Sequence, residues 1–170
     1  MRVLGKDYEG QDCAVARALE SVGERWTMLI VRDAFFGVRR FNDFQAHLDI
    51  PRAVLSGRLN GLVDDGILER VPDPEHAGRQ VYELTEAGHD LWPVVHALLV
   101  WGRRHRNAGI RVYLHAVCET ELEDSGACPK CGMTPEPEDV VSAPITRSSR
   151  DDPVAVALRS PHRLLEPLPT

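Results

Sequence analysis

The sequence predicts a mainly α-helical fold with a small β-hairpin, followed by a small cysteine-containing module and an extended tail. Three observations support this prediction. Apolar residues recur at helical spacing through most of residues 14–106, two short alternating runs flank a turn-rich loop, and seven of the 37 residues from Thr134 onward are proline. We expect three segments, with bounds 1–108, 109–133 and 134–170. Within the tail, Val140-Val141 and residues 154–158 could form short strands or pack on the core.

Composition excludes several classes of protein. The chain has 170 residues, of which 43% are hydrophobic and 27% are charged, and its net charge is −6. These values are ordinary for a globular protein. The longest uncharged apolar stretch, residues 91–101, is about half as long as the roughly 20 residues that a membrane span needs, and residues 1–12 lack the apolar core of a secretory signal. We therefore expect a cytoplasmic protein that has no membrane contact and whose cysteines are thiols or metal ligands.

Four helices are expected in the first part of the chain. Residues 14–36 carry apolar side chains at a helical spacing that is interrupted at Gly23, which predicts two helices, and residues 40–48 repeat the spacing. Pro51 opens a fourth helix, because a residue in the first turn does not need the N–H that proline lacks. Gly66 ends this helix, since glycine adopts the left-handed conformation of a helix C-terminus at low cost.

A hairpin and a final long helix follow. Residues 67–71 and 79–84 alternate in polarity around a loop rich in proline, aspartate and glycine, which predicts a β-hairpin. Thr85 is expected to cap a long helix that bends or breaks at Pro93. The apolar stripe of this helix, over residues 91–102, is either part of the core or a partner surface. Its extent and its two tryptophans favour an oligomer.

A helix, a tight turn, a second helix and a hairpin follow one another in a winged helix-turn-helix domain. The second helix, expected at residues 52–64, has its leucines on one face and small or hydrogen-bonding residues on the opposite face, so it could enter the major groove of DNA. Residues 36–61 also have a local positive charge, although the chain is acidic. Any single arginine here could be a solvated surface charge, but the order of the elements favours DNA binding. The candidate contacts are Arg39, Arg40, Arg52, Ala53, Ser56, Gly57, Arg58, Asn60, Arg79 and Gln80.

Several short motifs indicate the family that this sequence resembles. They are a cysteine near the first helix, Gly23-Glu24-Arg25-Trp26, Arg40-Phe41, the leucine run from Leu55 to Gly66, and Tyr82-x-Leu84-Thr85. Together with their surroundings, over residues 13–71 and 79–88, they closely resemble HxlR-type transcriptional regulators, which are winged-helix relatives of the MarR group. The resemblance spans roughly residues 10–106. It departs at Ala14, where the family usually has a proline, and at Pro51, where a serine or threonine often opens the recognition helix.

The resemblance implies a homodimer formed through the terminal helices, whose two recognition helices read a pseudo-palindromic DNA site. Some members of the family sense oxidants or electrophiles through the cysteine that matches Cys13, so this residue is a candidate sensor thiol. A free cysteine near a helix N-terminus could equally be a small buried residue. The effector would then be an oxidant or another small molecule.

Two short motifs within residues 109–133 predict a metal site. His115-x-x-Cys118 is followed by Cys128-x-x-Cys131 and then by a glycine. The two-residue spacing lets each pair of ligands share one turn around a tetrahedral zinc ion, and four ligands leave no open position for catalysis. We therefore expect a zinc-ribbon-like module with a structural zinc ion. The alternatives are a free thiol at Cys118, a surface histidine, and a ribbon that has lost its metal.

These predictions together indicate a transcriptional regulator rather than an enzyme. The protein is expected to bind double-stranded DNA as a homodimer at a pseudo-palindromic operator, and to respond to a thiol-reactive compound or a small-molecule ligand. The sequence has no glycine-rich phosphate loop and no paired carboxylates near the predicted metal ligands. The alternatives are a winged-helix module that binds only proteins, and a zinc- or thiol-dependent enzyme.

Overall fold

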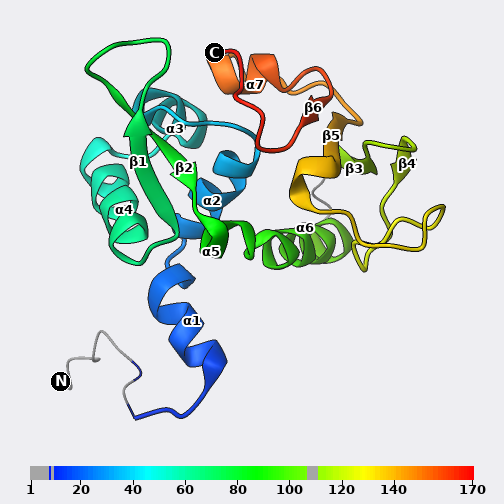
Figure 1. The fold of residues 1–170 in the computed structure, drawn as a ribbon, viewed down its shortest axis with the longest axis horizontal. Coiled ribbons are helices and arrows are strands. Elements are labelled where there is room, and N and C mark those ends of the chain that lie inside the picture. Colours follow the sequence, from blue (N-terminus) through cyan, green and yellow to red (C-terminus); the bar gives the residue numbers. More distant parts are fainter. Residues whose placement is uncertain (1–7, 9, 107–110) are drawn as a thin grey trace.

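The computed structural model describes residues 8, 10–106 and 111–170, so the boundary predicted near residue 108 lies outside the described residues. In Figure 1, α4 and the β1–β2 hairpin lie at the left, a four-stranded sheet lies at the right, and α6 runs between them. None of the helices in these described ranges is long and apolar enough to span a membrane. The elements are α1 (Ala14–Val22), α2 (Thr27–Phe35), α3 (Phe41–Leu48), α4 (Arg52–Asp64), β1 (Leu68–Pro72), β2 (Gln80–Leu84), α5 (Glu86–His89), α6 (Trp92–Arg106), β3 (Arg111–His115), β4 (Thr120–Glu121), η1 (Pro137–Asp139), β5 (Val140–Pro144), α7 (Pro153–Ala157) and β6 (His162–Arg163).

Helices α1 to α4 form where the apolar spacing predicts them. Gly23 is the C-cap of α1, as expected. Phe35, Phe44 and Leu55 are fully buried and belong to one core to which α2, α3 and α4 all contribute. Helix α1 is different, because Ala16 is its one buried residue and the helix projects away from the other helices (Figure 1). The apolar face of α1 is therefore left largely uncovered.

The hairpin also forms as predicted. β1 and β2 pair in antiparallel register, with Leu68 opposite Leu84. Thr85 follows β2 and caps helix α5, because its hydroxyl oxygen accepts a hydrogen bond from the Gly88 N–H at 3.2 Å. The predicted cap is therefore confirmed.

The long helix predicted after Thr85 is two helices in the structure. α5 ends at His89, and α6 begins at Trp92. The expected break therefore occurs, but at residues 90–91. Pro93 itself is the second residue of α6, where its missing N–H would have no partner within the helix. The chain therefore breaks before the proline rather than at it.

Residues 134–170 are folded, so the prediction of an extended tail was wrong. β5 pairs antiparallel with all five residues of β3, and β4 and β6 complete a sheet of order β4-β3-β5-β6. Pro137 and Pro153 stand at the starts of short helices, where a missing N–H is tolerated. The buried apolar residues of this segment include Val140, Val154, Ala155, Leu158, Leu164 and Leu168. Burial of these side chains joins the segment to residues 111–133 in one folded C-terminal unit.

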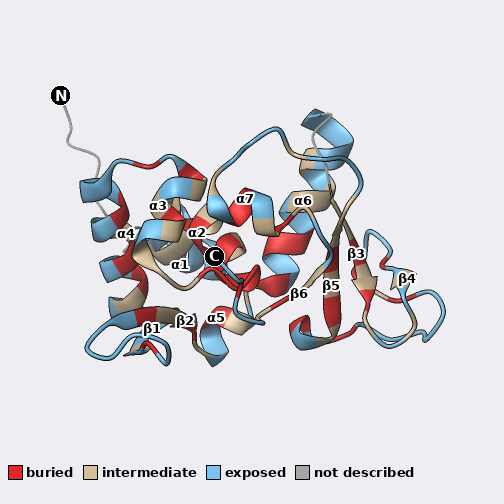
Figure 2. Ribbon diagram, turned by 90° about the horizontal axis from the view of Figure 1, so that it is seen from above, coloured by how far each residue is buried: buried red, intermediate tan, exposed pale blue. Residues whose placement is uncertain are grey.

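One core connects the helices with the C-terminal unit. The indole ring of Trp92 on α6 lies next to Phe35 of α2 and Tyr113 of β3, with ring centroids 5.3 Å and 5.4 Å away. In Figure 2, buried residues are found on α2, on α6 and on the adjoining strands of the sheet. The C-terminal unit is therefore a continuation of the helical core.

A segment that follows β6 returns to the helices and crosses the turn after α2. The Leu165 N–H donates to the Phe35 carbonyl at 2.8 Å, and the Leu168 N–H donates to the Gly37 carbonyl at 3.0 Å. Gly37 has a φ of +81°, and a Cβ built on it would lie 1.8 Å from the Glu166 carbonyl oxygen. This close backbone approach requires a glycine at position 37.

We expect Gly37→Ala to destabilise the protein much more than Gly78→Ala. Both glycines have a φ of +81°, a conformation that costs an alanine about 1–2 kcal/mol. Only at Gly37 would the new methyl group also collide with backbone atoms, whereas an added Cβ at Gly78 meets no atom within 4 Å. Moving the backbone away from Gly37 would break two hydrogen bonds that contribute about 1 kcal/mol each.

Urea denaturation of the two variants measures this difference. Equal losses in the free energy of unfolding would show that the segment after β6 does not hold its place against Gly37 in solution.

Candidate nucleic-acid interface and metal site

Helix α4 has one buried face and one exposed face, as predicted. Leu55, Leu59 and Leu62 are buried. The residues expected to face DNA are exposed: Ala53, Ser56, Gly57 and Asn60. Asn60 also accepts a hydrogen bond from Arg70 of β1. The exposed side chains are short, and α4 lies at the edge of the molecule (Figure 1), so this face could enter a major groove.

The two arginines of α4 are held differently. The Arg52 guanidinium lies over the Phe41 ring, 4.7 Å from its centroid, and forms no ion pair with a carboxylate among the described residues. Arg58 is half-exposed and pairs with Glu24, with 3.1 Å between nitrogen and oxygen. Arg52 is therefore the better placed of the two to contact DNA.

Arg39 and Arg40 are engaged with acidic residues of the hairpin. Arg39 pairs with Glu83 of β2. Arg40 pairs with Glu75 and, at 3.3 Å, with Asp73, and these two acids raise the pKa of Arg40 above its ordinary value. Both arginines therefore anchor the hairpin to the start of α3. Sequence reasoning missed this role, because the partners of Arg40 lie 33 and 35 residues further along the chain.

Asp73 organises the loop between β1 and β2, which we call the wing (residues 73–79). Its carboxylate accepts a hydrogen bond from the Glu75 N–H at 2.9 Å and lies 3.3 Å from Arg40 Nε and 3.2 Å from His76 Nδ1. These contacts, the Glu75 N–H first, lower the pKa of Asp73 to about 2. Arg40 thus offsets part of the negative charge of Asp73 and Glu75. Arg79 and Gln80 stay exposed at the end of the wing.

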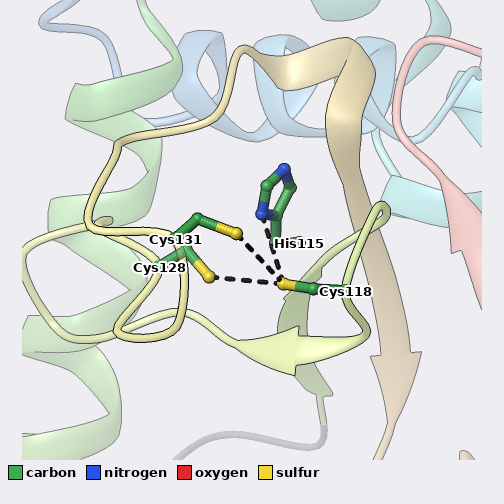
Figure 3. Close-up of side chains that lie close together, drawn as sticks. All are labelled: His115, Cys118, Cys128 and Cys131. Carbon is green, nitrogen blue, oxygen red and sulfur yellow. Dashed lines mark hydrogen bonds between the residues drawn. The ribbon is translucent and has the colours of Figure 1, made fainter.

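The four predicted metal ligands come together at one end of the C-terminal sheet (Figure 3). His115 is the last residue of β3, and Cys118 lies in the turn between β3 and β4. The Cys118 Sγ lies 3.4 Å from the imidazole Nδ1, 3.5 Å from Cys128 Sγ and 3.6 Å from Cys131 Sγ. All four atoms lie within 4.8 Å of one another. The sequence prediction of the cluster therefore agrees with the geometry.

Two turns of the same kind carry the two ligand pairs. In the first, the Glu119 N–H donates to the His115 carbonyl, and in the second, the Gly132 N–H donates to the Cys128 carbonyl, both at 2.8 Å. The residue after each second ligand has a positive φ, +53° at Glu119 and +68° at Gly132. The role of Gly132 was expected from the sequence. That of Glu119 was missed, because a residue other than glycine gives little signal for this conformation.

The distances fit a tetrahedral zinc ion. With Zn–S bonds of about 2.3 Å and Zn–N bonds of about 2.0–2.1 Å, a tetrahedron places two sulfur atoms roughly 3.8 Å apart and a sulfur and a nitrogen roughly 3.6 Å apart. The separations around Cys118 are close to these values. The Thr120 hydroxyl and N–H lower the pKa of Cys118 to about 6, which favours the thiolate that a metal binds. Hydrogen bonding to that sulfur raises the pKa of Cys131 to about 11, so a metal ion would have to displace this proton.

Cys13 lies apart from this cluster. It is exposed, and it is the N-cap residue of α1, with an extended backbone and no capping hydrogen bond from its side chain. The alternative of a small buried residue does not fit its position. The thiol is therefore accessible from solvent.

Comparison with known proteins identifies the family of the helix-turn-helix part of the chain. Residues 21–109 match the HxlR-like helix-turn-helix family. The chain belongs to this family. Two uncharacterised HTH-type transcriptional regulators, Mb3122 of Mycobacterium bovis and Rv3095 of Mycobacterium tuberculosis, are each 44% identical to it over 144 residues, which is 79% of this chain and 90% of theirs. These alignments are longer than the family match, so they extend into the C-terminal unit of this HxlR-like protein.

Solved structures give a consistent result. The crystal structure of PA1607, a candidate transcription factor, has a TM-score of 0.63 and 33% identity, and covers 85% of this chain and 99% of that one. The redox regulator HypR in its oxidised form has a TM-score of 0.51 and 31% identity. The match covers 56% of this chain and 100% of the HypR chain. The HxlR-like protein described here is therefore a transcriptional regulator with a helix-turn-helix fold.

We expect Asp73→Asn to loosen the wing while the helices stay folded. The amide would replace one of the two charged partners of Arg40 and the carboxylate that accepts the Glu75 N–H, so limited proteolysis at neutral pH should cut the wing faster than in the wild type. Glu69→Gln on β1 is the matched control, because it removes the charge of an exposed carboxylate that forms no ion pair among the described residues. Equal rates of cutting in all three proteins would show that Asp73 does not hold the wing.

The same variant should also change how stability depends on pH. The pKa of Asp73 is lowered from 3.8 to about 2, so its contribution to stability is fully present above about pH 4 and is lost as the pH falls through about 2. The difference in free energy of unfolding between wild type and D73N should therefore narrow between these pH values. A constant difference would contradict the lowered pKa.

Proposed function

We propose that this protein binds double-stranded DNA through α4 and the wing, as a homodimer on a pseudo-palindromic operator. The exposed face of α4 is the observation that carries the proposal, because its short side chains leave room for base edges and Arg52 stands at its start. Arg79 on the wing supplies a second cation, suited to a phosphate or to the minor groove beside the site.

Exposed apolar side chains on α1 and α6 support a homodimer. On α1, Val15 is 65% exposed and Leu19 is 46% exposed, and on α6 the exposed residues are Val94, Leu98 and Trp101. Apolar surface gathered on two helices is typical of a protein interface. In such a dimer the two α4 helices would bind half-sites about one helical turn, roughly 34–36 Å, apart.

A thiol response is proposed for Cys13. The residue is exposed at the start of α1, which belongs to the proposed dimer interface, so oxidation of the thiol would add polar atoms beside that interface. The similarity to the redox regulator HypR supports the same kind of response in this chain.

We further propose that His115, Cys118, Cys128 and Cys131 hold one zinc ion. The two similar turns and the distances between the ligand atoms support this assignment. The protein would fill all four positions of a tetrahedral ion and leave none for an activated water molecule. The ion would therefore stabilise the fold rather than catalyse a reaction, as expected of a regulator that is not an enzyme.

Arg52→Ala should weaken binding to a selected operator by about 1–3 kcal/mol, because a base contact would be lost. Arg79→Ala should weaken binding to all duplexes to a similar degree, because its expected contact is a phosphate. The operator can be selected from a random duplex pool, and fluorescence anisotropy then measures the affinities. Arg104→Ala is the matched control, since it removes an arginine at the other end of the molecule from α4.

Binding should also weaken as salt is raised, because phosphate contacts release counterions. Wild-type affinity that is retained in both R52A and R79A would contradict the proposed interface. Failure of the wild type to bind any duplex would instead favour a winged-helix module that binds only proteins.

We expect elemental analysis of protein made with zinc to find about one zinc ion per chain. Cys128→Ser should lose the ion and make the loop between β4 and η1 sensitive to protease, because so few residues bury too little surface to order it alone. The pairing of β3 with β5 should persist, since Tyr113 and Val140 belong to the common core. Cys13→Ser is the control and should keep its zinc. A wild-type chain without metal would refute the assignment.

A further inference from the structure

A cavity of about 670 Å³ lies between the helices and the C-terminal unit. Its volume is in the range of pockets that hold small molecules. The apolar residues that line it include Leu29, Phe36, Val95, Leu99, Leu122 and Leu158. Part of its wall comes from β3, β5 and α7, which lie beyond the residues 21–109 that match the family. The cavity is therefore built by the combination of the two parts of this chain.

Three arginines line the cavity, but two of them are already paired. Arg32 lies 2.6 Å from the buried carboxylate of Asp33, and Arg103 lies 3.2 Å from Asp124. Arg111 forms no ion pair with any carboxylate in the described ranges. It is therefore the one of the three whose positive charge is uncompensated.

The hydrogen bonds of Arg111 all go to neutral acceptors. Its Nε donates to the Ser142 hydroxyl oxygen at 2.6 Å, one terminal nitrogen donates to the Ser142 carbonyl at 2.9 Å, and the other donates to the Leu158 carbonyl. A guanidinium has five N–H groups, so about two remain for another acceptor. The side chain is partly buried, and this burial lowers the pKa of Arg111. An anion that entered the cavity would offset the cost of burying this charge.

The other titratable side chains that line the cavity do not compensate the positive charge of Arg111. Burial, with a contribution from Arg103, lowers the pKa of His96, which favours the neutral imidazole. Glu121 lies 3.6 Å from Arg103 and is thereby partly neutralised. His47 also lines the cavity and lies 2.8 Å from Asp33, the carboxylate that Arg32 contacts. Arg111 is therefore the guanidinium of the cavity that has no carboxylate partner in the described ranges.

We propose that this cavity binds a small amphipathic molecule with an apolar body and one carboxylate, and that the carboxylate is held by Arg111. The leucine, valine and phenylalanine side chains would contact the apolar body. Because α6 lines the cavity and also carries the proposed dimer surface, such a ligand is suited to act as an effector. That role rests on the proposed function, whereas ligand binding itself does not.

Isothermal titration of the full chain with octanoate and with octan-1-ol tests the proposal, since the two probes share their apolar chain and differ in charge. Octanoate should bind at one site per chain and at least about tenfold more tightly than octan-1-ol, because a hydrogen bond to a charged group is added. Arg111→Met should reduce octanoate affinity to that of octan-1-ol and leave octan-1-ol binding unchanged.

A second variant fills the cavity and leaves Arg111 in place. Gly102 on α6 lines the cavity, and an added Cβ there would meet no atom within 4 Å, so we expect Gly102→Leu to fold; leucine also favours the helix over glycine. It should weaken both probes. Gly61→Leu on α4 is the matched control, because its Cβ also meets no atom within 4 Å and it lies outside the cavity. Its binding should equal that of the wild type.

Three results would overturn the proposal: no octanoate binding by the wild type, equal affinity for the two probes, or octanoate affinity that is undiminished in G102L. The last of these uses a variant that retains Arg111, so it decides the matter even if Arg111→Met does not fold. Duplex binding is measured separately. A chain that bound octanoate as expected but bound no DNA would refute the proposed function and support the cavity.

Discussion

The packing of Trp92 is the interaction on which the rest of the molecule depends. Its ring contacts Phe35 of α2 and Tyr113 of β3, so three elements far apart in the sequence meet at one side chain. Aromatic pairs of this kind contribute about 0.5–1.5 kcal/mol each beyond the burial of their area. Because all three rings belong to one core, the candidate DNA-binding helix on one side and the candidate metal ligands on the other are parts of one folded body.

The alternation of side chains along β3 explains why two candidate sites are neighbours. Every second residue of a strand points to the same face, so Arg111, Tyr113 and His115 share one face of β3. The first two line the cavity, and the third faces the cysteines. A metal ion that held His115 would therefore also restrict the strand that carries the proposed carboxylate partner.

Sequence reasoning succeeded where the signals are local. The helices and the hairpin follow from periodicity, and the proximity of the candidate metal ligands follows from a two-residue spacing that brings each pair into one turn. It could not assign Arg40, since nothing near this residue distinguishes a wing anchor from a DNA contact. It preferred an extended tail for residues 134–170, although Val140-Val141 and residues 154–158 were possible strands or core segments, because β5 exists only through pairing with β3 and the prolines dominate the local pattern. The cavity arises from the same pairing, so it had no local signal either.

During synthesis, the helices leave the ribosome long before the segment that crosses them. Leu168 is made about 130 residues after Gly37, which at 5–20 residues per second is a delay on the order of ten seconds. Throughout that interval the turn after α2 lacks its cover, and until Tyr113 is made the ring of Trp92 lacks its contact with β3. The nascent chain would therefore present an apolar surface to chaperones. A chain released too early would keep that surface exposed and would tend to aggregate.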